Sequence, residues 1–304
     1  NIIKEFCVNI IFILTITKNI FFAKNLIFTM THPNLLFLPL YRLISFFTNC
    51  RLYYIRHNPT GFRHVTNSLK NILIVLTDYI ASMFSHRLLF FSRNVLQCFE
   101  QSLYKDKLYY IGFGINSFNK ITSTPCSPDN QTFIFFGRCL PYKGLDILIE
   151  ALNLINDRSL NLIVASNSIP MEHMNKLSKL KDKHTIDIFN EWLDDDRLDI
   201  LFKKSSCAIL PYREISQSGP VLTSMGYNIP IIASNLAGVK EYLTDLEDSL
   251  LFISEDPVSL KEKILLFNDS ADIQNKLRKG IISTAKKFSW KNVSINIENL
   301  TTDD

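Results

Sequence analysis

The second half of the chain alternates short apolar runs with segments of helical spacing, and this rhythm constrains the fold more than any other feature. After the run TFIFFG, which begins at Thr132, the next segment places Leu145, Leu148 and Leu152 on one helical face. Further apolar runs follow at NLIVAS, TIDIF, CAILP, PIIAS and SLLFI, with helical segments between them. Strands that are apolar throughout are buried on both faces, so the pattern predicts a parallel α/β sheet covered by helices on both sides.

The first half of the chain has the same kinds of elements in a less regular order. Strand-like runs occur at residues 26–32 and 51–57 and near 87–91. A segment rich in Ser, Thr, Pro and Asn then separates the two halves. The predicted organisation is an N-terminal domain over 1–118, a linker over 119–131, a second domain over 132–290 and a C-terminal helix or tail over 291–304.

Composition and charge narrow the class of protein. The 304 residues are 47% hydrophobic and 20% charged, which is typical of a folded globular chain. The net charge of +4 is small and dispersed, so nucleic acid is not an expected partner. The six cysteines have neither paired nor metal-type spacing, which favours a reducing compartment. The apolar run at 6–16 is too short to cross a bilayer as a helix and is interpreted as a buried strand or helix.

Ligands of parallel α/β sheets bind beyond the carboxyl ends of the strands, and two turns at such ends carry candidate binding residues. The first turn, GRCLPYKG, places Gly137 and Arg138 at the end of a strand and Lys143 just before a helix. Glycine permits a close approach of the backbone, and two cations at a helix N-terminus suit a diphosphate. Solvated loop charges are the alternative for either cation alone.

The second turn contains SQSGP and lies between two apolar runs. Its proline suits the first position of a helix, which makes Ser218 or Gly219 the cap and directs backbone N–H groups out of the sheet edge. The hydroxyls of Ser216 and Ser218 would add donors for an anion. An ordinary capped helix is the alternative, but it leaves Gln217 and the neighbouring Arg213 unexplained.

These turns and strands carry a resemblance to a known family. The segments FFGRCLPYKGLDILIEALNLI, WLDDDRLDILFKKSSCAILPYREISQSG and GYNIPIIASNLAGVKEYL resemble the nucleotide-binding domain of the retaining glycosyltransferases of family 4. The resemblance covers residues 132–290 densely. The earlier stretch that includes YYIRHNPTGFRH resembles, more loosely, the latter part of the family's acceptor domain. The resemblance implies the GT-B fold, with two Rossmann-like α/β domains.

The resemblance also implies roles for individual residues. Five of them fall where the family binds the diphosphate of the donor: Gly137, Arg138, Lys143, Ser218 and Gly219. His57 matches the family histidine that lies beside the reacting sugar, and it is the expected catalytic residue. A strand-end histidine without a catalytic role is the alternative for this position.

The sequence departs from the family where many members carry two glutamates, because those positions read Ile215 and Thr223. Glu214 is one residue out of register, which at a helix start redirects a side chain by about 100 degrees. The pattern resembles a subgroup with Ser-Gly in place of the first acid. The donor sugar and nucleoside are expected near Glu214, Ser216, Gln217 and Thr223.

A second departure concerns the start of the chain. In the family, the first strand leads into a glycine-rich loop, but here no glycine precedes Gly61. The N-terminal domain is therefore expected to be short or truncated.

The expected function is transfer of a sugar, with retention, from a nucleotide-diphosphate donor to a glycan or lipid-linked glycan in cell-surface polysaccharide synthesis. No metal or cofactor is expected, because the acidic triplet at 194–196 suits a capped helix start better than a Mg²⁺ site. The alternatives are a non-catalytic module that binds nucleotide sugars and an epimerase or phosphorylase on the same fold.

The expected location is the cytoplasm, and one segment raises the question of membrane contact. The run FSHRLLFFSRN at 84–94 mixes aromatic and basic residues, which would suit a peripheral contact with the inner membrane face. A core strand flanked by solvated Arg87 and Arg93 is the alternative interpretation of this run.

Overall fold

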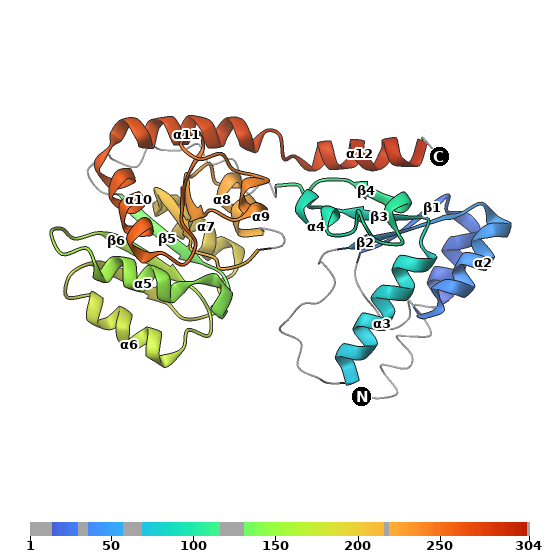
Figure 1. Ribbon diagram of the computed structural model, residues 1–304, viewed down its shortest axis with the longest axis horizontal. Helices are drawn as coiled ribbons and strands as arrows, with labels where there is room; N and C mark the ends of the chain where they lie inside the picture. The colour runs from blue at the N-terminus through green and yellow to red at the C-terminus, as the bar shows by residue number, and fades with distance from the viewer. Residues whose placement is uncertain (1–13, 30–35, 57–68, 116–130, 216–218, 303–304) are drawn as a thin grey trace. The chain divides into compact units, whose positions relative to one another are not determined.

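The computed structural model describes residues 14–29, 36–56, 69–115, 131–215 and 219–302. The chain forms two compact units (Figure 1): unit 1 contains residues 1–112 and 293–304, and unit 2 contains residues 113–292. No helix in the described part of the chain is both long enough and apolar enough to cross a bilayer.

Unit 1 is built on a parallel sheet of four strands in the order β1-β2-β3-β4. The strands are β1 (Asn25–Phe28), β2 (Arg51–Arg56), β3 (Arg87–Phe90) and β4 (Leu108–Tyr110). The helical segments are residues 14–22, α2 (Leu38–Thr48), α3 (Leu69–Phe84), α4 (Arg93–Gln97), the 3-10 turn η2 (Lys105–Lys107) and most of α12 (Trp290–Thr302). Side chains of β2, β3 and α2 share one core cluster.

The end of the chain belongs to unit 1. Asn296 on α12 donates a hydrogen bond from Nδ2 to the backbone oxygen of Ile111 at 3.0 Å, just after β4. The C-terminal helix or tail expected from the sequence is therefore a helix that is fastened to the N-terminal sheet.

Unit 2 contains a parallel sheet of six strands in the order β10-β9-β8-β5-β6-β7. The strands are β5 (Thr132–Phe136), β6 (Asn161–Ala165), β7 (Thr185–Phe189), β8 (Cys207–Leu210), β9 (Ile231–Ser234) and β10 (Ser249–Phe252). The helices are α5 (Leu145–Asn153), α6 (Met171–Leu180), α7 (Asp195–Lys204), α8 (Gly219–Gly226), α9 (Ala237–Lys240), α10 (Pro257–Asp269) and α11 (Ala271–Ala285). Strand and helix alternate along the chain, as the apolar rhythm predicts.

Helices cover both faces of this sheet because each strand sends alternate side chains to opposite sides. On β5, Phe133 and Phe135 join one core cluster, which includes residues of α5, α6 and α10. Ile134 and Phe136 join the other, which includes residues of α7, α8 and α9. Two Rossmann-like units with parallel sheets confirm the predicted α/β fold class.

The structure decides between two interpretations of the run at 84–94. Leu88, Leu89 and Phe90 are fully buried on β3, and Phe91 is buried just after it. The run is therefore a core strand, and its aromatic side chains are not a surface for lipid. The predicted linker at 119–131 lies outside the described residues except for Gln131, so its boundaries stay a prediction.

A glycine in α11 offers a test of how closely unit 2 is packed. A methyl group added at Gly280 would lie 2.0 Å from the backbone oxygen of Glu247. We expect Gly280→Ala to lower the free energy of unfolding by about 2 kcal/mol, measured by urea denaturation, because backbone cannot move aside cheaply. The neighbouring Lys279 is exposed, and Lys279→Ala should change that free energy by less than about 0.5 kcal/mol. Equal effects of the two substitutions would contradict this packing.

Candidate functional site

Two turns meet at the carboxyl edge of the unit 2 sheet. Strands β5 and β8 are parallel neighbours, so the turn after β5 (137–144) and the turn after β8 (211–218) begin at the same edge. The backbone nitrogen of Arg213 donates to the backbone oxygen of Tyr142 at 2.8 Å. The two candidate turns, separated by some seventy positions in the sequence, are therefore in direct contact.

Gly144 permits this contact. It follows the 3-10 turn η3 (Pro141–Lys143), has φ of +69° and precedes the first residue of α5. A β-carbon at this position would lie 1.8 Å from the backbone oxygen of Pro211 in the other turn. Only glycine accepts both this conformation and this approach.

The ammonium of Lys143 is buried beside one aromatic ring from each turn. Its side chain is only 9% exposed, and its Nζ lies 4.0 Å from the ring centroid of Tyr212 and 5.3 Å from that of Tyr142. Tyr142 belongs to the first turn and Tyr212 to the second. Burial lowers the pKa of Lys143 to about 8, and no carboxylate among the described residues forms an ion pair with it.

A buried ammonium without an anion is costly, and two aromatic rings compensate only part of that cost. Groups with strongly shifted pKa values and no structural partner mark candidate binding sites. The arrangement around Lys143 is therefore suited to receive a negatively charged ligand at the sheet edge.

The other residues predicted for the first turn differ in what they can offer. Arg138 is exposed and forms no ion pair within the described part of the chain. Gly137 donates its N–H to the oxygen of Ala165 at 3.0 Å, and its own oxygen accepts from the hydroxyl of Ser166 at 2.6 Å. The exposed guanidinium of Arg138 can therefore bind a negatively charged ligand, whereas the backbone groups of Gly137 are already hydrogen-bonded and fix the shape of the turn.

Gly219 is the first residue of α8 and is exposed, so the positive end of this helix directly follows the second turn. Pro220 is thus the second helical residue, one position later than its sequence context predicts. Ser216, Gln217 and Ser218 lie outside the described residues, and their expected contacts with the donor stay predictions.

Arg213 is engaged by carboxylates of the protein instead of being left free for an anion. Its guanidinium contacts both carboxylate oxygens of Asp146, at 2.9 and 2.5 Å, and the carboxylate of Glu255 at 3.3 Å. These hydrogen bonds lower the pKa of Asp146 and raise that of Arg213. The charge of Arg213 is therefore already balanced within the protein.

The residues expected near the donor sugar and nucleoside are only partly described. Glu214 is exposed in the second turn, and Thr223 is half-buried in α8. At Ile215, where many family members carry a glutamate, the side chain packs against the unit 2 core. His57 lies outside the described residues, directly after β2, and its catalytic role stays a prediction.

The acidic triplet at 194–196 forms a helix start, as predicted. The side chain of Asp194 accepts a hydrogen bond from the backbone nitrogen of Arg197 at 2.9 Å and caps α7. Asp195 and Asp196 occupy the first turn of that helix, where negative charge is favourable.

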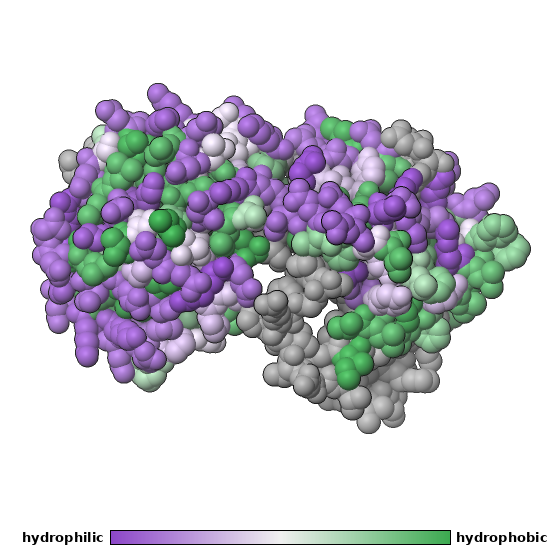
Figure 2. All heavy atoms as spheres, in the orientation of Figure 1, coloured by the Kyte–Doolittle hydropathy of each residue, from purple (hydrophilic) through white to green (hydrophobic). Residues whose placement is uncertain are grey.

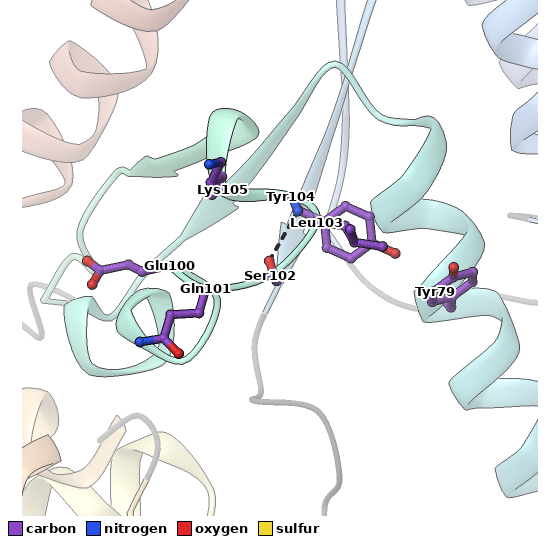
Figure 3. A pocket seen from close by; sticks show the side chains of 7 residues that line it. All are labelled: Tyr79, Glu100, Gln101, Ser102, Leu103, Tyr104 and Lys105. Carbon is purple, nitrogen blue, oxygen red and sulfur yellow. Dashed lines mark hydrogen bonds between the residues drawn. The ribbon is translucent and has the colours of Figure 1, made fainter.

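Unit 1 has a hollow of about 730 Å³ at its surface. Tyr79 on α3 and Tyr104 lie near each other there, with ring centroids 6.3 Å apart. Figure 3 shows the polar ends of Glu100 and Gln101 directed away from the two rings. Glu100 and Gln101 therefore do not converge with the two rings on a shared ligand position.

The sequence interpretation missed three residues of the site: Tyr142, Tyr212 and Asp146. A signal for the two tyrosines was present, because both turns contain proline, tyrosine and a basic residue in that order, Pro141-Tyr142-Lys143 and Pro211-Tyr212-Arg213. The repeat predicts related positions for the two tyrosines. It gives no sign that one cation binds a carboxylate and the other does not.

The two Rossmann-like units define the GT-B class of fold, and comparison with known proteins agrees. Residues 130–268 match the family model described as glycosyl transferases group 1. An uncharacterized glycosyltransferase of Methanocaldococcus jannaschii is 27% identical over 52% of this chain and 44% of its own length. The chain thus spans less than half the length of that relative.

Solved structures share the fold at low sequence identity. Anabaena HepE in complex with UDP superposes with a TM-score of 0.71 and 15% identity, covering 95% of this chain and 82% of that one. A glycosyltransferase from Rickettsia africae gives a TM-score of 0.67 and 18% identity, covering 86% and 73%.

The burial of Lys143 predicts an effect on stability. We expect Lys143→Met to raise the free energy of unfolding at pH 7, by at most about 3 kcal/mol, because a methionine carries no charge that must leave water. The Lys143 pKa of about 8 lies below its ordinary value, so the cost of burying the charge is fully present below pH 8. It disappears as pH rises toward about 10.4, the pKa of an unfolded lysine.

Urea unfolding at pH 7 and pH 9.5 measures this difference. The advantage of Lys143→Met should be largest at pH 7 and smaller at pH 9.5. The exposed Lys181, which follows α6 at the opposite edge of the sheet, provides the control Lys181→Met. Destabilisation by Lys143→Met at pH 7 would show that the ammonium is compensated in the unliganded protein.

Proposed function

We propose that this chain is a glycosyltransferase that takes a sugar from a nucleotide-diphosphate donor bound at the two turns of unit 2. The observation that carries this proposal is the buried ammonium of Lys143 at the carboxyl edge of adjacent parallel strands, which forms no ion pair with any residue that the structure describes. Both turns lie within the segment that matches the glycosyl transferases group 1 model. A diphosphate would supply an anionic partner for this ammonium.

The geometry suits the departure of a nucleoside diphosphate. Negative charge grows on the leaving oxygen as the bond to the sugar breaks, so cations fixed at that point stabilise the transition state more than the bound donor. Lys143 is fixed and shielded from water, which strengthens its interaction with charge. Arg138 and the first turn of α8 at Gly219 would contact the same diphosphate from its exposed side.

The finer assignments are proposals that rest on the family resemblance. They are retention at the anomeric carbon, a glycan or lipid-linked glycan acceptor, a place in cell-surface polysaccharide synthesis in the cytoplasm, and His57 beside the reacting sugar. The UDP present in the HepE structure supports a nucleotide donor. Independence from metal is proposed because the acidic triplet at 194–196 is occupied as a helix cap.

A peripheral membrane contact, if the acceptor is lipid-linked, would use a surface other than 84–94. Figure 2 shows hydrophobic side chains gathered over α2 and α3 of unit 1. Phe46 and Phe47 on α2 and Ile72 and Val75 on α3 are among the exposed apolar side chains. Vesicle co-sedimentation with and without anionic lipid tests this contact, and loss of binding in Phe46→Ser with Phe47→Ser would locate it.

Substitution of the two cations should weaken binding of UDP. We expect Lys143→Met and Arg138→Ala each to cost about 1.5 to 3 kcal/mol of binding free energy, the range for hydrogen bonds to charged groups. Isothermal titration of UDP measures the loss, with Lys181→Met as the control that should leave affinity unchanged. Unaltered titration curves for both Lys143→Met and Arg138→Ala would refute the proposed site.

The same titrations should depend on pH in a defined direction. The second pKa of a phosphate is about 6, so the terminal phosphate of UDP is fully deprotonated above pH 8. Affinity should therefore fall above pH 8, by up to about tenfold per pH unit, as Lys143 loses its proton. In Lys143→Met this decline should be absent.

Incubation with a panel of nucleotide sugars separates a transferase from the alternatives. A transferase gives transfer or slow hydrolysis in the presence of EDTA, and retention appears as conservation of the anomeric configuration by NMR. A binding module predicts affinity for the nucleotide without turnover, and an epimerase predicts a changed sugar that is still attached to the nucleotide.

A further inference from the structure

Arg213 joins the two turns that flank Lys143 by more contacts than any other side chain described above. Its Nη1 donates to the backbone oxygen of Pro141 at 2.8 Å and to Asp146, which also accepts from Nη2. Its backbone nitrogen donates to Tyr142, and its guanidinium also contacts Glu255. One residue of the second turn thus contacts two residues of the first turn, Pro141 and Tyr142, and Asp146 in the first turn of α5.

The side chains beside these contacts are the ones that surround Lys143. Tyr142 accepts the backbone hydrogen bond of Arg213, and Tyr212 precedes Arg213 in the chain. If the turns separated, the two rings would no longer face the ammonium together, and water would reach Lys143. The position of the ammonium therefore depends on the distance that Arg213 sets between the turns.

We propose that Arg213, through its paired contacts with Asp146, is a positioning residue that holds the two turns together so that Tyr142 and Tyr212 fix the ammonium of Lys143 for the diphosphate. This inference rests on the proposed function of the site. Under this proposal the two related sequences, Pro-Tyr-Lys and Pro-Tyr-Arg, have different roles: Lys143 contacts the ligand, and Arg213 does not.

The obvious rival is that Arg213 itself binds the diphosphate after leaving Asp146. The two ideas differ in the effect of Asp146→Asn. If Arg213 is a ligand, loss of the carboxylate frees the guanidinium, and UDP should bind as well as before or more tightly. If Arg213 positions Lys143, the same change loosens the turns and UDP should bind more weakly.

The test is UDP titration of Arg213→Met, Asp146→Asn and the double variant at several pH values. We expect each single variant to weaken binding about tenfold and the double variant to be no weaker than the worse single one, because both changes break one contact. The pH above which affinity declines should move upward in all three, since water reaches Lys143. Arg213→Lys, which keeps the charge but not the planar fork, should recover only part of the affinity.

Arg158 supplies a matched control. It too contacts two carboxylates, Asp157 at 2.8 Å and Asp269 at 2.5 Å, but it follows α5 at the opposite edge of the sheet. Arg158→Met should leave UDP affinity and its pH dependence unchanged. Unchanged or tighter binding in Asp146→Asn, or additive losses in the double variant, would overturn the positioning role.

A ligand-free measurement keeps this inference separate from the proposed function. If the wild-type protein fails to bind UDP, the proposed function is wrong, but the positioning role still predicts a result in urea unfolding. The gain in stability from Lys143→Met at pH 7 should shrink in the Arg213→Met background, because Lys143 would then be hydrated in either case. A gain of the same size in both backgrounds would show that Arg213 does not control the burial of Lys143.

Discussion

The burial of the Lys143 ammonium between two tyrosine rings is the interaction on which the candidate site depends. One ring comes from each turn, so the lysine is shielded only while the turns touch. Contact between the turns requires β5 and β8 to be neighbours in the sheet and requires a glycine at position 144. The strand order and the glycine at position 144 thus keep the ammonium of Lys143 out of water, with no carboxylate partner among the residues that the structure describes.

Much of the fold followed from local spacing. Alternation of apolar strands and helices predicted the parallel sheet of unit 2, and the acidic triplet predicted the start of α7, because both signals involve residues close together in the chain. The meeting of the two turns was also predictable, since the carboxyl ends of parallel strands share one edge.

The pairing of side chains across the site was not predictable in this way. Pro-Tyr-Lys and Pro-Tyr-Arg look equivalent in the sequence, but Arg213 reaches Asp146, 67 positions away, and Glu255, 42 positions away. The aromatic and basic run at 84–94 shows the same limit, because burial of Phe90 depends on the helices packed around β3. Local pattern predicts an element, whereas the partners of a charged or aromatic side chain depend on the assembled fold.

The return of the chain from unit 2 to unit 1 has a consequence for folding. Unit 2 is one continuous segment, so its contacts can form without any residue of unit 1. Unit 1 is started first but cannot be finished until α12 has been translated and Asn296 reaches the end of β4. A chain that ends shortly after Asn292 would therefore keep every strand of the unit 2 sheet, whereas unit 1 would lack the contact between Asn296 and Ile111.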